Sequence, residues 1–369
     1  MSTKDLFRAL EFAHYANRYR DRIFVVALHG DVPFQELLPD IKVLAGYHIQ
    51  VVLVAPDPAD HLASLVTLAN KRGTRLKLIA EPRQTAAEEP DPARLLAALA
   101  NRETPLLAFK PTPSTPVEAA YLLAEKVARR LGANKLFLVR PSLEELVPLF
   151  PRSHITLEEL VHCRPKLTGP NGRLEPLLAF IRETLEHNPA DIVLLEGKTP
   201  RLFEEVFTYD GSGLLFTKTK STRIRPARLE DITDMMMLLK PEIAAGRILP
   251  VEESEVESGL DFYRVYEVEG DLVGLARLKQ YGTWAELSRF ATLHRYRGRG
   301  RARELAVRLI EEAIQQKMDA VFALSVDPRM WTFFNSLGFV ETSRENLPGS
   351  WKTGYDFSRP SKAFVKELT

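Results

Sequence analysis

The sequence has almost no cysteine, since Cys163 is the only one among 369 residues. A lone cysteine excludes an intramolecular disulfide, and such a residue most often packs as a small hydrophobic side chain in the core. We therefore expect Cys163 to be a core residue, and we expect no metal site.

Long apolar runs and an excess of charge are also missing. No stretch reaches the length of a membrane-spanning helix, and residues 1–11 are charged, without the apolar core of a signal peptide. The formal net charge is only +1, whereas nucleic-acid-binding domains are usually strongly basic. We expect a cytoplasmic protein that binds neither nucleic acid nor membranes.

The length predicts about two domains, and the polar stretch T-K-T-K-S-T at residues 217–222 has the composition of a short linker. Before it, short apolar runs alternate with helical patterns, which predicts an α/β sandwich with a mainly parallel sheet. We expect domains at residues 1–218 and 223–369. In the first we expect strands at residues 23–28, 50–54, 76–80, 106–109, 135–139, 192–196 and 214–217, helices at 5–20, 34–44, 93–99, 116–131 and 200–207, a surface loop at 84–92, and a capping box formed by Thr156 and Glu159.

The most informative stretch is a glycine- and arginine-rich turn, Arg297-Gly298-Arg299-Gly300-Arg301-Ala302. A helix follows it, because Leu305, Leu309 and Ala313 recur at helical spacing. Glycines allow a ligand to approach the backbone closely, and the first N–H groups of a helix have no intrahelical partner. The turn is thus a candidate site for a pyrophosphate, although an exposed basic loop or a contact to RNA phosphates would fit the same spacing.

The wider context resembles the GNAT acetyltransferase superfamily. Arg297-x-x-Gly300-x-Ala302 is similar to its acetyl-CoA pyrophosphate loop, and the neighbouring motifs occur in the same order: Arg225-Pro226-Ala227, a hairpin through Gly270-Asp271, and Phe333 to Phe339 ending in Gly-Phe. The resemblance implies a GNAT domain at residues 223–369 with acetyl-CoA as co-substrate. It also implies that the turn, Arg297, Gly298, Arg299, Gly300, Arg301 and Ala302, binds the cofactor, and that backbone amides of Phe290, Ala291 and Thr292 polarise the thioester.

The first half resembles an amino-acid kinase domain, through its strand–helix order and the run E-E-V-F-T-Y-D-G-S-G at residues 204–213. Phosphoryl transfer needs cations and glycine amides around the phosphates. Where the family has a lysine and paired glycines, this chain has His29-Gly30-Asp31. It has prolines at positions 56 and 58 in place of glycines, and Arg140 in place of a catalytic aspartate. We predict a kinase-like fold without kinase activity.

A kinase-like half fused to a GNAT half is the architecture of the N-acetylglutamate synthase family, and the closing segment, Tyr355-Asp356-Phe357-Ser358-Arg359-Pro360-Ser361-Lys362, is similar to that family's C-terminal motif. The resemblance implies transfer of an acetyl group to the α-amine of L-glutamate, the first step of arginine biosynthesis. The alternatives are a GNAT enzyme acting on another amine, and a non-catalytic sensor of arginine or acetyl-CoA.

Two residues are candidates for proton transfer. Glu286 precedes the cofactor turn by one strand and could take a proton from the amine, directly or through water; otherwise it is a surface charge or half of an ion pair. The resemblance places Ser325 against the substrate, where it could protonate the leaving thiol; otherwise it bonds its own backbone. Many GNAT enzymes use a late tyrosine as the acid, but Phe334 stands at the matching position here.

Glutamate carries two carboxylates, for which Arg289 and Arg359 are the candidate ligands, because guanidinium groups pair with carboxylates in a bidentate manner. The family's further arginine for the α-carboxylate is absent, since Val251 stands there. Either Arg247 takes its place or the acceptor is not glutamate.

Arginine is the expected effector. In the family it binds near the segment matched by Glu205 and Gly211, although a surface role for Glu205 is the simpler interpretation. We also expect a homo-oligomer, the size of which the sequence leaves open.

Overall fold

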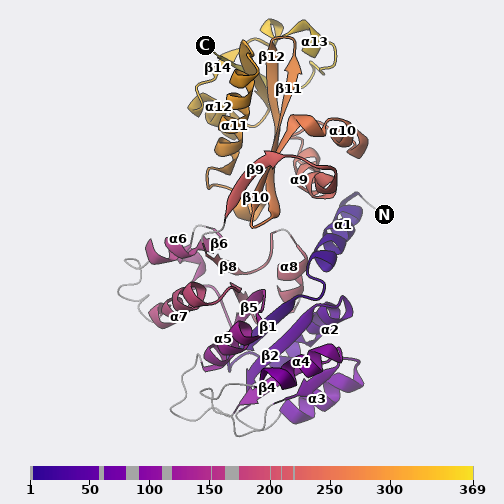
Figure 1. Cartoon of the computed structure of the whole chain (residues 1–369), viewed down its shortest axis with the longest axis vertical. Helices are drawn as coiled ribbons and strands as arrows, with labels where there is room; N and C mark the ends of the chain where they lie inside the picture. The colour runs from indigo at the N-terminus through magenta and orange to yellow at the C-terminus, as the bar shows by residue number, and fades with distance from the viewer. Residues whose placement is uncertain are drawn as a thin grey trace. The chain divides into compact units, whose positions relative to one another are not determined.

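The computed structural model describes residues 3–57, 62–79, 91–109, 119–150, 152–162, 174–199, 201–208, 210–218 and 221–368 (Figure 1). The chain divides into two compact units, Met1–Thr219 and Lys220–Thr369. Cys163, positions 58 and 209, and residues 84–90 of the expected loop lie outside the described residues. Within the described part of the chain, none of the helices is both long and apolar enough to cross a bilayer.

In the described part of the first unit, eight strands form one sheet in the order β3-β4-β2-β1-β5-β7-β8-β6. All neighbours pair in parallel except β7 and β8, which are antiparallel. The strands are β1 (Ile23–Leu28), β2 (Gln50–Pro56), β3 (Leu76–Leu78), β4 (Thr104–Phe109), β5 (Lys135–Arg140), β6 (His154–Thr156), β7 (Asp191–Glu196) and β8 (Leu214–Thr217). The predicted, mainly parallel sheet is therefore confirmed.

Helices cover both faces of this sheet, because its strands are apolar on both sides. Along β1, Val25 and Ala27 enter one core, whereas Phe24, Val26 and Leu28 enter the other. The first core is closed by α4 (Pro92–Ala100), α5 (Ala119–Leu131), α6 (Leu157–His162) and α7 (Glu175–His187); the second by α1 (Thr3–Arg18), α2 (Leu38–Gly46), α3 (Leu62–Lys71) and α8 (Arg201–Phe207). The capping box is present, since Thr156 N–H donates to Glu159 Oε2 at 2.9 Å and Glu159 N–H to Thr156 Oγ1 at 3.3 Å.

The described part of the second unit contains a seven-stranded sheet in the order β14-β15-β13-β12-β11-β10-β9. Its strands are β9 (Thr222–Pro226), β10 (Tyr263–Val268), β11 (Asp271–Tyr281), β12 (Trp284–Thr292), β13 (Ala320–Ser325), β14 (Val340–Thr342) and β15 (Lys362–Glu367). The long helix α11 (Arg301–Gln315) and α12 (Pro328–Ser336) pack on one core, and α9 (Ile232–Ala244) and α10 (Glu253–Ser258) on another. The short helix α13 (Gly349–Lys352) precedes β15 in the chain.

One irregularity in this sheet positions the site. The neighbours β12 and β13 run parallel but pair over three residues each, from Trp284 to Glu286 and from Ala320 to Phe322. Just beyond that point, Ser288 and Ala291 of β12 face Arg277 and Leu275 of β11, so that two residues oppose one in a β-bulge. Arg289 in the bulge has a φ of +55°, a left-handed conformation that is uncommon for a non-glycine residue. Beyond Glu286 and Phe322, β12 and β13 therefore separate and leave a wedge-shaped gap between them.

Candidate active site in the second unit

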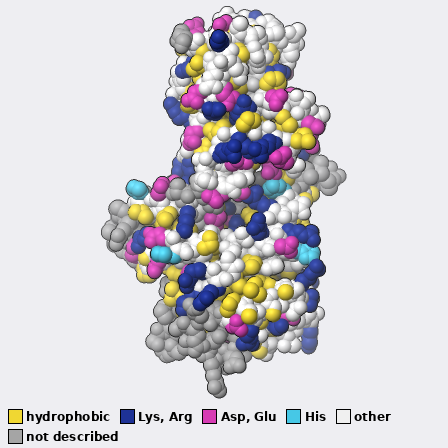
Figure 2. All heavy atoms as spheres, viewed as in Figure 1, with side chains coloured by type: hydrophobic (Ala, Val, Ile, Leu, Met, Phe, Trp, Pro, Cys, Tyr) yellow, Lys and Arg dark blue, Asp and Glu magenta, His cyan; other side chains and the backbone are white. Residues whose placement is uncertain are grey.

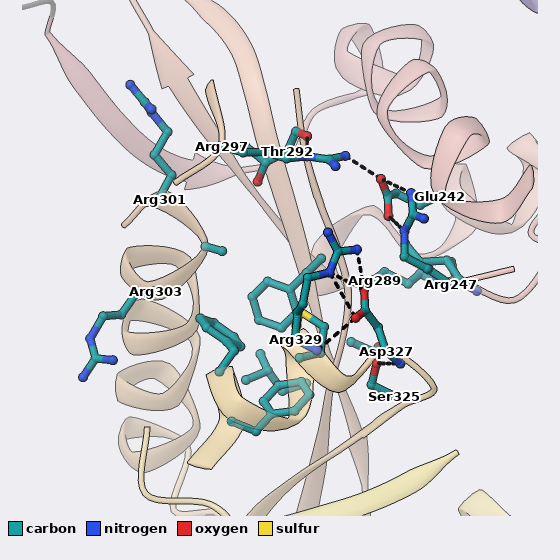
Figure 3. A pocket seen from close by; sticks show the side chains of 18 of the residues that line it. Glu242, Arg247, Arg289, Thr292, Arg297, Arg301, Arg303, Ser325, Asp327 and Arg329 are labelled. Atoms are coloured by element: carbon teal, nitrogen blue, oxygen red, sulfur yellow. Dashed lines mark hydrogen bonds and ion pairs between the residues drawn. The ribbon is translucent and has the colours of Figure 1, made fainter. Parts of the chain in front are cut away.

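A cavity of about 600 Å³ occupies the wedge (Figure 3). It is lined from β12, from the turn before α11, from the end of β13 with α12, and from the end of α9 and the turn that follows it. Its arginines outnumber its carboxylates: the lining contains Arg247, Arg289, Arg297, Arg301, Arg303 and Arg329, against Glu242 and Asp327. An anionic ligand is the chemical match for such a wall.

The glycine-arginine turn lies at the cavity, where the sequence placed a cofactor loop. Gly300 is the N-cap of α11 with a φ of +79°, and no side chain caps the helix there. Gly298 is left-handed as well, with a φ of +75°. A Cβ built on Gly300 would meet nothing closer than Glu304 Oε1 at 3.8 Å, so the helix start is open to a ligand. The amides of a helix N-terminus in this state suit a phosphate group.

The arginine side chains of this turn are engaged mainly with the protein. Arg301 is buried, donates from Nη1 to the carbonyl of Tyr296 at 2.7 Å, and lies over the rings of Tyr266 and Tyr296. Arg297 donates from Nε to the carbonyl of Thr292 at 3.0 Å. These side chains hold the shape of the turn, which leaves its backbone as the part suited to contact a ligand.

The expected residues Phe290, Ala291 and Thr292 form the end of β12. Phe290 and Thr292 line the cavity, whereas Ala291 is buried in the core beneath α9. The Phe290 ring packs edge-on against Phe333 at 5.5 Å and Phe334 at 6.3 Å. Phe334 is itself fully buried, so no hydroxyl is available from that position of α12.

Glu286 lies near the wedge but is not among the residues that line the cavity. Its carboxylate is buried and accepts hydrogen bonds from Arg277 Nη2 at 2.6 Å and Trp351 Nε1 at 3.2 Å. The Ser288 hydroxyl donates to the same carboxylate at 3.3 Å and is part of the cavity wall. The ion pair is thus present, and Ser288 links the carboxylate to the cavity. The role of Glu286 as a base stays a prediction.

Ser325 ends β13 and lines the cavity. Its Oγ accepts the backbone N–H of Asp327 at 3.0 Å, and its carbonyl accepts Trp331 Nε1 at 2.8 Å. The backbone contact expected for a strand-end serine is present. Among the described residues, Oγ accepts this contact and donates to none, so the hydroxyl proton stays available for donation.

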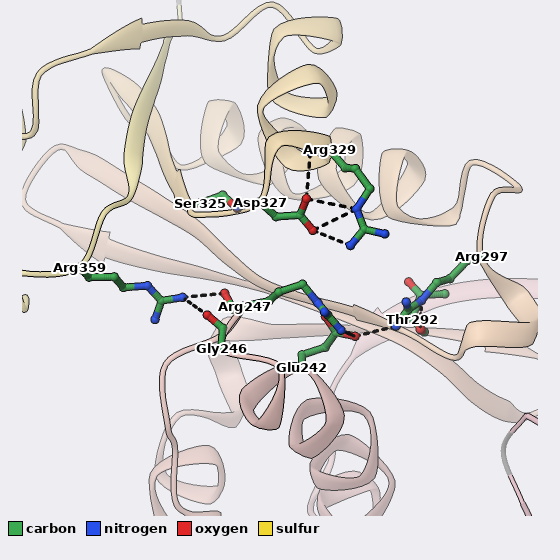
Figure 4. A network of polar contacts seen from close by, with 9 residues as sticks. All are labelled: Glu242, Gly246, Arg247, Thr292, Arg297, Ser325, Asp327, Arg329 and Arg359. Atoms are coloured by element: carbon green, nitrogen blue, oxygen red, sulfur yellow. Dashed lines mark hydrogen bonds and ion pairs between the residues drawn. The ribbon is translucent and has the colours of Figure 1, made fainter.

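The two arginines expected to bind the substrate have partners within the protein. Arg289 lines the cavity, but its guanidinium donates to Glu255 Oε1 at 2.6 Å and to the Tyr263 hydroxyl. Burial alone would lower the pKa of Arg289, but the Tyr263 oxygen and the Glu255 carboxylate raise it above its usual value. Arg359 is not among the lining residues; its Nη2 donates to the carbonyls of Gly246 at 2.8 Å and Arg247 at 2.9 Å (Figure 4).

Val251 is a core residue. Its side chain is 7% exposed and packs with Met235, Leu239 and Val256. Val251 is thus a packing residue, and it is not among the residues that line the cavity.

A polar network in the cavity wall was not anticipated from the sequence. Glu242, near the C-terminal end of α9, accepts hydrogen bonds from Arg247 Nε at 2.6 Å and Arg297 Nη2 at 2.6 Å (Figure 4). Asp327 pairs with Arg329 at 2.7 Å across the cavity wall (Figure 3). Asp327 could have been found as the N-cap of a Pro-started helix, whereas nothing in the local pattern marks Glu242.

In the first unit, Glu205 lies in α8, and Gly211 lies in the turn that leads from this helix to β8. Glu205 is buried and accepts the backbone N–H groups of Ser212 at 2.8 Å and Gly213 at 2.9 Å. Gly211 has a φ of +59°, and its N–H donates to Thr208 Oγ1 at 3.1 Å. The interpretation of Glu205 as a surface glutamate is therefore wrong, since its carboxylate organises the turn. Among the described residues, no group of three or more His, Cys, Asp or Glu side chains could hold a metal ion.

On the face shown in Figure 2, basic and acidic side chains are interspersed among uncharged ones. This mixture agrees with the near-zero net charge. The arginine excess of the cavity is a local feature.

Comparison with known proteins identifies a domain family for the second unit and relatives that extend into the first. Residues 248–348 match the Acetyltransferase (GNAT) domain family, so the second unit carries a GNAT domain. The chain is 28% identical over 266 residues to an amino-acid acetyltransferase of Pseudomonas fluorescens, covering 71% of this chain and 61% of that protein. It is 26% identical over 256 residues to one from Aliivibrio fischeri, covering 66% and 56%. The chain thus spans about three fifths of the length of these relatives.

The fold of the whole chain has a solved counterpart. The crystal structure of N-acetylglutamate synthase from Neisseria gonorrhoeae, complexed with coenzyme A and L-arginine, aligns over 100% of both chains with a TM-score of 0.61 and 20% sequence identity. The predicted fold, an amino-acid-kinase-like α/β sandwich followed by a GNAT domain, is confirmed. So is the resemblance to the N-acetylglutamate synthase family.

Proposed function

We propose that this chain is an amino-acid N-acetyltransferase that transfers the acetyl group of acetyl-CoA to the α-amine of L-glutamate. The observation that carries the proposal is the wedge between β12 and β13, which opens onto an uncapped helix start with two left-handed glycines. The amino-acid acetyltransferases to which the chain is similar supply the substrate class.

The wedge suits an extended acyl-CoA. The diphosphate would rest on the amides at the start of α11, where the helix dipole favours negative charge. The amide-bearing pantetheine arm would lie along β12, where the backbone no longer pairs with β13, and an extended ligand can add to a strand in this way. The thioester would then reach the bulge at Arg289.

In the proposed reaction, the acceptor ammonium first loses a proton to Glu286, through the Ser288 hydroxyl or a water molecule. The free amine attacks the thioester carbon and forms a C–N bond, while amides near the bulge stabilise the negative charge on oxygen. The intermediate collapses with loss of the C–S bond, and Ser325 donates its proton to the leaving thiolate. The nitrogen gives up its second proton, which returns to the Ser325 oxygen, so that the amide is neutral and the serine is regenerated. The products are an N-acetyl amino acid and coenzyme A.

The test is release of free thiol from acetyl-CoA in the presence of each of the twenty amino acids. We expect release that depends on glutamate. Release with a different amine would leave a GNAT enzyme of other specificity. Calorimetric binding of coenzyme A with no thiol release from any acceptor would leave the sensor alternative.

We also propose that the first unit binds L-arginine and lacks kinase activity, and that the protein is a homo-oligomer. A thermal shift with L-arginine and not with L-lysine, reduced in E205Q, would support the first point. Consumption of ATP with any amino acid would contradict the second, and light scattering gives the number of subunits.

A further inference from the structure

The cavity has to supply a cation for the carboxylate of the acceptor. Arg289 uses its guanidinium for Glu255 and Tyr263. Arg303, on α11, donates to the hydroxyl and carbonyl of Ser336. Each of these two cavity arginines therefore uses both of its terminal nitrogens, Nη1 and Nη2, in contacts within the protein.

Arg247 differs from them in its hydrogen-bond geometry. The Glu242 carboxylate accepts hydrogen bonds from one edge of its guanidinium, from Nε at 2.6 Å and from Nη2 at 3.2 Å. The end that carries Nη1 has no hydrogen-bond partner among the described residues, and the side chain is 32% exposed in the cavity wall. A guanidinium held on one edge still offers a fork of N–H groups to a second carboxylate.

The backbone around Arg247 is fixed as firmly as its side chain. The N–H groups of Arg247 and Ile248 both donate to the carbonyl of Glu242, at 2.9 and 3.2 Å, and Gly246 turns the chain with a φ of +70°. Arg359 braces the same turn through its two carbonyl contacts. The position of Arg247 is therefore set before any ligand arrives, which reduces the entropy lost on binding.

Glu242 remains charged in this arrangement. Burial alone would raise its pKa, but the hydrogen bond from Arg247 and the charge of Arg297 hold the pKa of the carboxyl below its usual value. Because the same carboxylate bonds Arg297 of the cofactor turn, one group aligns the cofactor side and the opposite side of the cavity (Figure 4).

We propose that Arg247 binds the carboxylate of the acceptor, with Glu242 as its positioning residue, in place of the arginine that Val251 replaces. This inference rests on the proposed acetyltransferase function and makes it more specific. The acceptor is an amino acid with a free carboxylate, and its carboxamide is a poor substrate.

The experiment compares glutamate with its α-carboxamide and γ-carboxamide in wild type, R247Q and R247K. A charge-assisted hydrogen bond lost to glutamine predicts a KM for glutamate raised about 10- to 100-fold with kcat little changed. R247Q should also lose the preference for the acid over one of the two amides, while the Kd for coenzyme A stays as in wild type. R247K keeps the charge without the fork and should fall between.

R308Q is the matched control. Arg308 forms an ion pair at 3.0 Å with the buried carboxylate of Glu312, which also pairs with Arg264. After loss of Arg308 the carboxylate would still have this second arginine, just as Glu242 would still have Arg297 after loss of Arg247. Arg308 does not line this cavity, so R308Q should retain wild-type KM and preference. If R247Q does not fold, the acid-over-amide preference of R247K alone tests the inference, because the lysine leaves a positive charge beside the buried Glu242 carboxylate.

Two results would overturn the inference: R247Q and R247K that discriminate acid from amide as wild type does, or R329Q that abolishes the discrimination while R247Q does not. Calorimetric binding of glutamate to the coenzyme A complex adds a readout independent of turnover. If wild type bound glutamate through Arg247 but released no thiol, the acetyltransferase proposal would fail and the assignment of Arg247 would stand. If wild type bound no amino acid, both would fail.

Discussion

Replacing Glu286 with glutamine separates two roles that one buried carboxylate could combine. Glu286 and Arg277 are both 11% exposed in their side chains, and their charged atoms lie 2.6 Å apart. Removing one member of such a buried pair leaves the other uncompensated, at a cost of about 3–5 kcal/mol in the free energy of unfolding. A general base contributes about 10²- to 10⁴-fold to the rate, which is a separate quantity.

A double-mutant cycle distinguishes the roles. We expect E286Q to lower kcat about 100-fold or more in its folded fraction, and R277Q to lower kcat by less than about tenfold although it destabilises the unit to a similar degree. The double variant E286Q/R277Q should recover much of the stability, since neither charge is left alone, but none of the rate.

Urea unfolding followed by intrinsic fluorescence gives the folded fraction at assay temperature, and thiol release gives kcat. The reasoning is refuted if E286Q keeps kcat within about tenfold of wild type. It is equally refuted if R277Q loses as much rate as E286Q and the double variant loses no more, because the carboxylate would then act only through its ion pair.

Three further predictions concern single residues of the second unit. S288A should lower kcat, because the Ser288 hydroxyl donates to the Glu286 carboxylate, and S288T should restore it; a kcat of S288A equal to that of wild type would remove Ser288 from the proton path. G300A should weaken coenzyme A binding in calorimetry. The control G282A has a similar φ of +68° and open space around its Cβ, so it should introduce comparable strain of about 1–2 kcal/mol without a change in affinity. Equal affinities in G300A and wild type would argue against binding of the diphosphate by the amides at the start of α11. Burial alone would raise the pKa of the Asp231 carboxyl, but the Arg225 guanidinium and the Arg228 amide lower it below its usual value. The contribution of Asp231 to the free energy of unfolding is therefore complete above the unfolded pKa of about 3.9 and is lost as pH falls through the lower folded pKa. In urea titrations at a series of pH values, D231N should lose less stability on acidification than wild type, and an equal loss in both would contradict the assignment.

The turn before α11 could be predicted because local rules define it. Glycines that permit a left-handed backbone, followed by leucines at helical spacing, specify an open helix start whatever surrounds it. The buried strands of the first unit were readable for the same reason. The pairing of β7 with β8 was not: a strand buried on both faces has the same apolar pattern in either direction, and the antiparallel pairing became visible only in the structure.

The arginines show which part of the site could not be predicted. The role of Arg289 and Arg359 at the substrate stays a prediction, but the protein groups that their guanidinium groups contact could not be inferred from the sequence. Arg289 meets Glu255, 34 residues earlier, and Arg359 meets carbonyls more than a hundred residues away. Such partners are set by tertiary folding, which residue type and spacing do not encode.

The arrangement of charge in the cavity follows from a requirement that composition conceals. The chain is nearly neutral, but in the proposed reaction a diphosphate and an acceptor carboxylate lie close together, and their mutual repulsion has to be offset locally. Glu242 adds a further negative charge to this region, which appears counterproductive until its two partners are considered. By fixing Arg247 on one side and the cofactor turn through Arg297 on the other, it orients a guanidinium and a backbone turn at the same time, at the expense of net positive charge. The cavity thus depends on where its arginines are held more than on how many it contains.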